Sequence, residues 1–362
     1  MPGKIIMDLP PTPENNRNSE GAFIPLKNGN ILFVYSRYGS GGLKDGSPAD
    51  LYGILSEDNG ETFSKPFPVL TRQALGADNI MSVSLERMKN GDIGMFFLYK
   101  KDADCLCCFT RSSDEGRSWS NPVLCGPDKG YFIVNNDRIL RCQNGTLLIP
   151  AACHAVELTE VPGKGNRLSI RTGTLWIFAS EDDGFTWTVR AQNIRLPYSR
   201  GLTTGVQEPG LVQLSDGTLW CYIRTDAGKQ YECFSSDQGK TWSTPLPSWF
   251  SSPVSPLSVK RLSDGRLLAV WNPIPIYNGR PFRIEGVNTG ARTPLVYALS
   301  SDDGETFSTP VVLEDDPRSG YCYTAIFETA DGGVMLAYCA GCVEDGSKLS
   351  RLRIRKLMMD HL

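Results

Sequence analysis

This chain of 362 residues differs in its content of cysteine and histidine. These two residue types most often hold metals or carry redox chemistry. The chain contains 11 cysteines but only 2 histidines. Many of the cysteines lie in apolar runs, such as Cys105, Cys107 and Cys108 in CLCCF, and no CxxC pair answers another at the spacing of a zinc site. We therefore expect buried, reduced thiols, as is typical of the reducing cytosol. We also expect no metal site and no organic cofactor.

A second group of polar residues has the types needed to bind or protonate a sugar. Asn135, Asn136, Asp137 and Arg138 precede an Asn-Gly dipeptide, and His154 follows it in IPAACHAV. The ordinary pKa of histidine suits acid–base work near neutral pH. His154 is predicted either as a sugar ligand or as a residue that ends a strand, and Asp137 and Arg138 are candidate ligands in the same unit.

Two short repeats run through the whole chain. The first reads Ser-x-Asp-x-Gly-x-Thr/Ser-aromatic, is called the Asp-box below, and begins at Ser56, Ser112, Ser180, Ser235 and Ser300. The second is a turn dipeptide between apolar runs, at Asn28-Gly29, Asn90-Gly91, Asn144-Gly145, Asp216-Gly217, Asp264-Gly265 and Asp331-Gly332. Such dipeptides between apolar runs are strong hairpin signals.

The two repeats alternate, so that units of about sixty residues fill the chain. Their flanks have strand length, and no stretch sustains a helical period. This pattern predicts an all-β fold, a six-bladed β-propeller with about four antiparallel strands per blade, as a single domain over residues 1–362. We interpret the Asp-boxes as structural, because the Asp accepts hydrogen bonds from turn amides, the Gly takes a positive φ and the aromatic ring packs beneath. The sixth unit has only a degenerate box, as expected where the ring closes on the N-terminal segment.

Five Asp-boxes in phase with six hairpins resemble the sialidase (neuraminidase) superfamily, over nearly the entire chain. The resemblance implies a propeller that cleaves a terminal sugar whose anomeric carbon carries a carboxylate. Enzymes of this family use a tyrosine nucleophile activated by a glutamate, an aspartic acid as the acid, and an arginine triad that holds the substrate carboxylate. Arginine suits that role because it pairs with a carboxylate in a bidentate manner.

Four residues of this chain match the family pattern in order. In VQEPGLVQLSDGTLWCYIR, Glu208 and Arg224 flank a hairpin and are similar to the family's glutamate and second arginine. Arg292, upstream of the fifth Asp-box, looks like the third arginine. Tyr323, eight residues before the last turn dipeptide, looks like the nucleophile, with Tyr321 as the alternative.

The acid is expected in the Gly-rich loop before the first Asp-box. Asp45 lies eleven residues before Ser56 and is similar to the family's acid/base residue, and Asp50 is the alternative. Loops of this composition are also common as plain surface turns.

The chain departs from the family at the first arginine. Sialidases carry Phe-Arg-Ile-Pro there, whereas this chain reads AFIP, so that Phe23 stands in the place of the arginine. Arg17, Arg37 and Arg138 are candidates to supply a third guanidinium. Glu20, expected near the axis, is a candidate polar contact.

Charge and hydropathy limit the partners. The net charge of −3 argues against nucleic acid, which normally requires a basic excess. The N-terminal apolar run is broken at Asp8 and Pro10, too early for a signal peptide or a membrane span, so we expect a cytoplasmic protein without a membrane partner. A glycan is the expected partner, and the oligomeric state is left open.

Three functions are therefore carried forward. The leading one is an exo-acting, retaining hydrolase that removes a terminal acidic sugar, sialic acid in the first instance. The second keeps the fold but acts on another glycan, uronic-acid or rhamnose-containing, by hydrolysis or by β-elimination with His154 and Tyr323. The third is a non-catalytic propeller that binds glycan.

Overall fold

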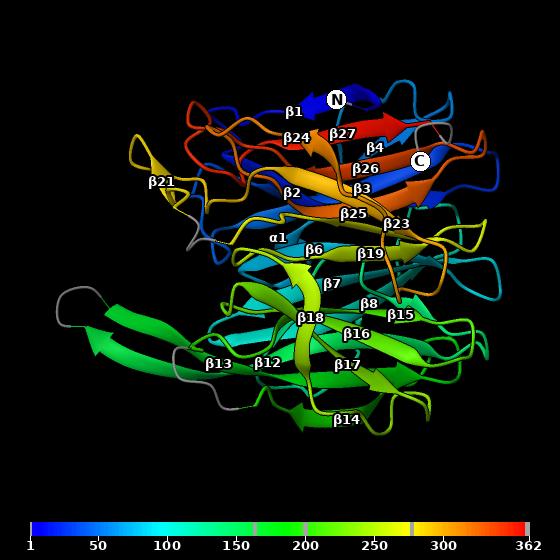
Figure 1. Cartoon of the computed structure of the whole chain (residues 1–362). Helices are drawn as coiled ribbons and strands as arrows, with labels where there is room; N and C mark the ends of the chain where they lie inside the picture. The colour runs from blue at the N-terminus through cyan, green and yellow to red at the C-terminus, as the bar shows by residue number, and fades with distance from the viewer. Residues whose placement is uncertain (1, 162–164, 198–201, 276–278, 359–362) are drawn as a thin grey trace.

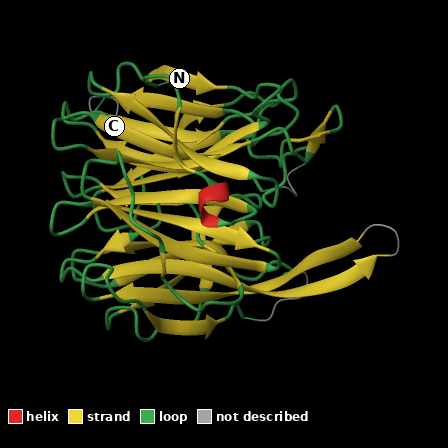
Figure 2. Cartoon of the chain, turned by 180° about the vertical axis from the view of Figure 1, so that it is seen from behind, coloured by secondary structure: helices red, strands yellow, loops and turns green. Residues whose placement is uncertain are grey.

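The computed structural model describes residues 2–161, 165–197, 202–275 and 279–358, and its regular structure is almost entirely β-strand (Figure 1). Within these ranges the one helix is the short α1 (Arg72–Leu75), drawn in red in Figure 2. No helix in the described ranges has the length and apolar character needed to cross a membrane. The all-β prediction is confirmed.

Four sheets contain four strands each. The first has the order β2 (Arg17–Pro25), β3 (Ile31–Tyr38), β4 (Ala49–Ser56) and β5 (Phe67–Leu70). The second has the order β15 (Gln207–Gln213), β16 (Leu219–Arg224), β17 (Lys229–Ser235) and β18 (Leu246–Ser251). The third has the order β19 (Ser258–Arg261), β20 (Leu267–Trp271), β23 (Leu295–Ser300) and β24 (Val311–Glu314). The fourth has the order β1 (Lys4–Leu9), β27 (Leu352–Leu357), β26 (Val334–Cys339) and β25 (Cys322–Glu328).

A larger, nine-stranded sheet contains the second and third sequence units. Its main path is β14 (Thr188–Ile194), β13 (Gly165–Ser180), β12 (Leu147–Val161), β10 (Tyr131–Ile133), β8 (Asp104–Ser112), β7 (Ile93–Lys101) and β6 (Asn79–Arg87). Beside this path lie β9 (Val123–Leu124) on β8 and β11 (Leu140–Arg141) on β12, and a separate ribbon consists of β21 (Arg283–Ile284) and β22 (Val287–Asn288). Because β10 bridges the two units, the sheets do not separate them, and the count of six blades stays a prediction.

Each predicted turn dipeptide joins two consecutive antiparallel strands, which confirms the hairpins. Gly29 lies between β2 and β3 with φ of 89°, and Gly217 lies between β15 and β16 with φ of 90°. Residues with a Cβ rarely adopt this conformation, which is why glycine ends each dipeptide.

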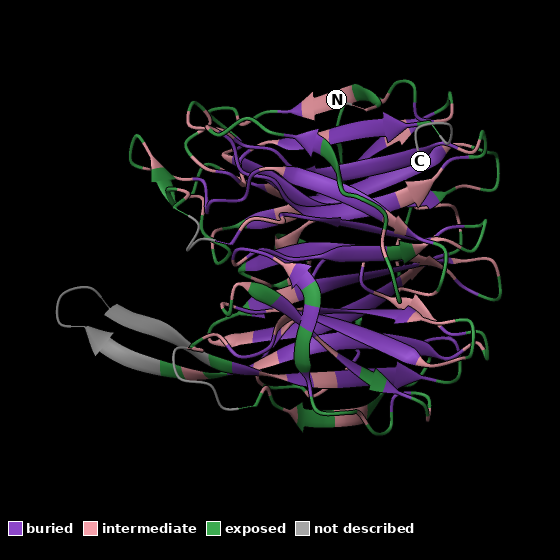
Figure 3. Cartoon of the chain, viewed as in Figure 1, coloured by how far each residue is buried: buried purple, intermediate pink, exposed green. Residues whose placement is uncertain are grey.

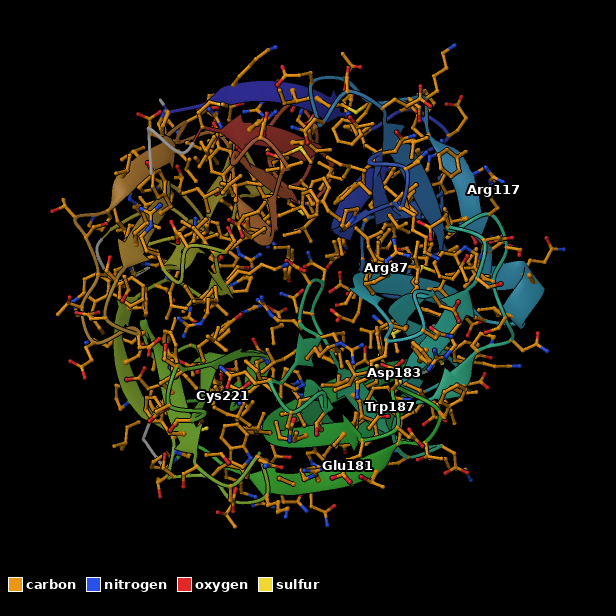
Figure 4. All side chains as sticks on the ribbon, turned by 90° about the vertical axis from the view of Figure 1, so that its right-hand side faces the viewer. Arg87, Arg117, Glu181, Asp183, Trp187 and Cys221 are labelled. Carbon is orange, nitrogen blue, oxygen red and sulfur yellow. The ribbon has the colours of Figure 1, made fainter. Side chains whose placement is uncertain are left out.

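The Asp-boxes hold turns at the same ends of the sheets as the hairpins. In the third box, Asp182 accepts hydrogen bonds from the amide and hydroxyl of Thr186, at 2.8 and 2.6 Å. Trp187 packs edge-on against Phe96, with ring centroids 5.7 Å apart. Figure 4 looks onto this face and labels Trp187 and Arg117, both from Asp-boxes. The structural interpretation of the boxes is confirmed.

The two ends of the chain meet in one sheet, where β1 pairs with β27 antiparallel, as expected for closure on the N-terminal segment. Hydrophobic clusters fill the space between neighbouring sheets, for example where Phe33 of β3 packs with Met335 of β26. Figure 3 shows the buried residues concentrated in the strands and the exposed ones in the turns, and Figure 4 shows the sheets arranged around a central axis. All 11 cysteines are free and nine of them are buried, as predicted for structural thiols.

Candidate active site

A cavity of about 280 Å³ lies at the ends of the strands opposite to the hairpins. The cavity is lined by Glu20, Glu208 and Tyr323, which lie in the first half of β2, β15 and β25 respectively. The hairpins follow the last residues of these strands. The same strands therefore carry the structural turns at one end and the polar side chains at the other.

A shared backbone irregularity turns these side chains into the cavity. Glu20, Ser82, Glu208 and Tyr323 have φ values of 49°, 59°, 41° and 61°, and each lies where the register between two strands shifts. Such a β-bulge redirects a side chain, and non-glycine residues adopt a positive φ at a cost of about 1–3 kcal/mol each. All four lie eight residues before a turn dipeptide, so this spacing would have added Ser82, which lines the cavity, to the predicted residues.

Tyr323, Glu208 and Arg224 form a connected group in the cavity wall. The Tyr323 hydroxyl donates to Glu208 Oε1 at 3.0 Å, and Arg224 Nη1 lies 2.6 Å from Glu208 Oε2. Burial, and then the charge of Glu208, raise the pKa of Tyr323 well above its ordinary value. The phenol is therefore protonated at neutral pH, and Glu208 is positioned to accept its proton.

Arg292 joins this group from the loop before β23. Its guanidinium carbon lies 5.4 Å from the centre of the Tyr323 ring, and its Nε and Nη2 donate to the Val254 carbonyl at 3.2 and 2.9 Å. Arg292 Nη1 and Arg224 Nε are buried without a hydrogen-bond partner. Both arginines line the cavity, so that their guanidinium groups can attract an anionic ligand there.

The opposite side of the cavity is acidic. Asp45, whose side chain is 58% exposed, and the buried Glu20 both line it, and Arg17 holds both from behind. Arg17 Nη1 lies 2.6 Å from Asp45 Oδ1, and Nη2 lies 2.9 Å from Glu20 Oε2. Although burial alone would raise it, the charges of Arg17 and Lys100 lower the pKa of Asp45 to about 2, whereas burial raises the pKa of Glu20.

Two lysines in the cavity were missed by the sequence analysis. Lys100, at the end of β7, donates through Nζ to the Asp45 carbonyl at 2.9 Å. Lys348 precedes β27 and donates to Asn288 Oδ1 at 3.0 Å. Neither lysine lies at the repeat position that marks the other residues, so no signal in the sequence distinguishes them from surface lysines.

The predicted polar cluster of residues 135–138 lies only partly in the cavity wall, and its other members contact neighbouring strands. Asn135 lines the cavity together with His154, which is buried on β12. Asp137 and Arg138 do not line it. Asp137 accepts hydrogen bonds from Lys260 Nζ and from a β25 amide, and Arg138 is buried against Tyr222, with its guanidinium carbon 5.3 Å from that ring's centre. These contacts join strands of different sheets.

The remaining predicted arginines, Arg17 and Arg37, also do not line the cavity. Arg17 is completely buried and reaches the cavity only through the two carboxylates that it holds. Arg37 does not line the cavity, because its guanidinium stacks 4.6 Å from the centre of the Tyr52 ring. Among the described residues, Arg224 and Arg292 are the arginines that line the cavity.

Two sequence interpretations need correction. Phe23 does not stand at the cavity: it is buried in the core, 4.3 Å from Phe33 between ring centroids, because the bulge in β2 turns Glu20 into the cavity and the following residues away from it. The alternative acid Asp50 pairs with Arg72 at 2.8 Å and does not line the cavity.

The alternative nucleophile Tyr321 is likewise placed outside the cavity. It packs in a hydrophobic cluster, and burial raises the pKa of its hydroxyl to about 12. Within the described part of the chain, no group of three or more His, Cys, Asp or Glu side chains is arranged to hold a metal ion.

Comparison with known proteins agrees with this architecture. The family of BNR repeat-like domains matches residues 83–336. Anhydrosialidase from Macrobdella decora is 28% identical over 279 residues, which cover 70% of this chain and 32% of that protein. The chain thus spans about a third of the length of this relative.

Solved structures share the fold at low sequence identity. A leech intramolecular trans-sialidase complexed with 2,7-anhydro-Neu5Ac superposes with a TM-score of 0.70 at 17% identity, covering 99% of this chain and 70% of that one. A mutant of NanB sialidase from Streptococcus pneumoniae superposes with a TM-score of 0.69 at 15% identity, covering 100% of this chain and 71% of that one. These likenesses establish the sialidase type of β-propeller.

Proposed function

Since the chain belongs to the family of BNR repeat-like domains and has the sialidase propeller fold, we propose that it is a glycoside hydrolase of the sialidase type. Its substrate would be a glycan with a terminal acidic sugar, sialic acid in the first instance. The sialidase names of its relatives support this proposal, and the cavity chemistry supports it independently.

The hydrogen bond of 3.0 Å between Tyr323 and Glu208 carries the proposal. A sugar with a carboxylate at its anomeric carbon would repel a carboxylate nucleophile, whereas a neutral phenol avoids that repulsion. As Tyr323 attacks the anomeric carbon, Glu208 would accept its proton, and Arg224 holds the second oxygen of Glu208 in place. Displacement by Tyr323 and then by water would retain the configuration.

The remaining groups would bind the sugar and transfer protons. Arg224 and Arg292 would hold the carboxylate through their guanidinium groups. Asp45 would protonate the leaving oxygen and then deprotonate water. Its low pKa in the ligand-free cavity requires that bound substrate exclude water from the carboxylate first, which raises the pKa of an acid.

The test is release of a fluorophore from an α-sialoside by the wild type and by Tyr323→Phe. We expect turnover by the wild type and a loss of at least about 10³-fold in kcat in the variant. Wild-type inactivity against several sialic-acid variants would refute the sialidase proposal.

One observation favours the second candidate, which acts on a different glycan such as a uronic-acid-containing or rhamnose-containing polymer. Only two arginines line the cavity in the described chain, and Glu20 lies at the bulge position of β2. His154 and Tyr323 line the same cavity, as a β-elimination would require of its base and acid. A product with the absorbance of an unsaturated sugar would identify a lyase, and binding without turnover would identify the non-catalytic propeller.

A further inference from the structure

The basic side of the cavity contains a third cation besides the two arginines. Lys348 lies in the segment between β26 and β27, with 9% of its surface exposed, and it lines the cavity together with Arg224 and Arg292. Lys348 does not lie at the position, eight residues before a turn dipeptide, that Glu20, Glu208 and Tyr323 share. Its role must therefore be judged from its surroundings.

Glycines from distant segments leave room for this side chain. A Cβ added at Gly320 would lie 2.7 Å from Lys348 Cβ, and one added at Gly290 would lie 3.1 Å from its Cε. The Gly341 amide donates to the Lys348 carbonyl at 3.1 Å. The stem of the lysine is thus held in a slot that delivers its ammonium group to the cavity wall.

The ammonium group is held by neutral partners. Within the described chain it pairs with no carboxylate, and Nζ donates to the neutral amide oxygen of Asn288 at 3.0 Å and lies 5.8 Å from the centre of the Phe282 ring. Burial, and then the charges of Arg292 and Arg224, lower its pKa to about 8 against the opposing charges of Cys322 and Asp45. A buried cation near two others is unfavourable until an anion binds among them.

We propose that Lys348 completes, with Arg224 and Arg292, a three-cation site for the carboxylate of an acidic sugar. The inference that the ligand is an acidic sugar rests on the proposed function. The inference that the ligand is an anion rests on the three cations. Arg224 and Arg292 supply guanidinium groups that can pair with a carboxylate in a bidentate manner, and Lys348 supplies a point charge.

The acidic side of the cavity explains why a lysine takes this role. Arg17 is committed to Glu20 and Asp45, at 2.9 and 2.6 Å, and has no exposed surface. Glu20 would repel an anion placed beside β2. The carboxylate is therefore expected next to Arg224, Arg292 and Lys348 rather than next to Glu20.

The experiment compares Lys348→Met with the wild type and with Lys65→Met, a control at an exposed lysine. Calorimetry measures binding of N-acetylneuraminic acid, of glucuronic acid and of their uncharged methyl esters. We expect the wild type and the control to prefer an acid over its ester, and Lys348→Met to lose about tenfold or more of that preference. A purely structural role would weaken acid and ester alike.

Each outcome separates this inference from the proposed function. Unchanged acid preference in Lys348→Met refutes the role of Lys348, whether or not the wild type hydrolyses a sialoside. Lost preference together with no wild-type turnover supports Lys348 and refutes the hydrolase. Absence of wild-type binding to both acids refutes the three-cation site. Thermal unfolding monitors folding, and the variant is expected to be at least as stable as the wild type because it removes a buried, unpaired charge.

Discussion

Replacement of Arg17 by methionine tests whether this buried arginine supports the acidic side of the cavity. In the folded protein its guanidinium donates to Glu20 Oε2 at 2.9 Å, to Asp45 Oδ1 at 2.6 Å and to Ser19 Oγ at 2.9 Å. It also stacks 4.3 Å from the centre of the Tyr38 ring. Methionine retains much of the packing volume but removes every donor.

The expected cost comes mainly from Glu20. The Asp45 side chain is 58% exposed, so water can replace its lost partner, and that pair contributes little. Glu20 is 3% exposed and would be left as a buried carboxylate without its ion-pair partner, held by a hydrogen bond from the Ser19 hydroxyl. Removing one partner of a buried pair costs about 3–5 kcal/mol, a large part of the 5–15 kcal/mol typical of a folded protein.

Urea unfolding at pH 7 measures this loss, and Arg17→Met/Glu20→Gln is the matched control. The double variant should recover more than half of the lost stability, because a neutral amide tolerates burial better. In Arg17→Met the pKa of Glu20 stays higher in the folded state than in the unfolded state. The variant's loss in free energy of unfolding, relative to the wild type, is therefore small below about pH 4 and grows as the pH rises. A loss below about 1 kcal/mol, or a further loss on adding Glu20→Gln, would refute this account.

Four further predictions follow from the site and the core. Glu208→Gln should lower kcat about 10²–10⁴-fold in a fluorogenic assay with an unchanged circular dichroism spectrum, since it removes the base and the ion pair with Arg224 but keeps the size of the side chain. Phe23→Ala should cost about 3–5 kcal/mol in urea unfolding but leave the KM of the folded enzyme within twofold; a changed KM would return Phe23 to the cavity. Hydrogen bonds from Thr186, against the effect of burial, hold the pKa of Asp182 at about 2, so its ionised form stabilises the protein above about pH 4 and this contribution is lost between about pH 4 and 2. Thermal melts of Asp182→Asn should therefore show a smaller fall in that range. The KM for an acidic substrate should rise above about pH 8 as Lys348 loses its proton, and a pH profile of Lys348→Met should lack this limb.

The Tyr323–Glu208 pair of the proposed mechanism was identified through the family resemblance, and it also follows a spacing in the repeats. Tyr323 and Glu208 each lie eight residues before a turn dipeptide, and each occupies the bulge of its strand. Applied to every unit, the same spacing points to Glu20, Ser82, Asn136 and Pro256, of which Glu20 and Ser82 line the cavity. The rule works because a fixed distance from a hairpin fixes the position along the strand.

The errors arose where the direction of a side chain depends on an extra residue in a strand. The shift between Ser19 and Ala22 reverses which residues of β2 face the cavity, so the match of AFIP to a family motif placed Phe23 where Glu20 lies. Side chains alternate along a regular strand, and one added residue exchanges the two faces. Gly21, which follows Glu20 inside the shifted segment, is the sequence feature that is typical of such a bulge.

The family resemblance pointed to Tyr323, Glu208, Arg224 and Arg292, and the sequence by itself determined the all-β repeat architecture and the structural role of the Asp-boxes. These depend on local turn chemistry and on spacing, which a linear pattern preserves. Only the tertiary structure decided that Arg17 faces two carboxylates and that Lys348 enters the cavity through a slot between Gly290 and Gly320. The physical reason is that a buried charge is directed by the partners and the free space around it, and here both come from segments far apart in the chain.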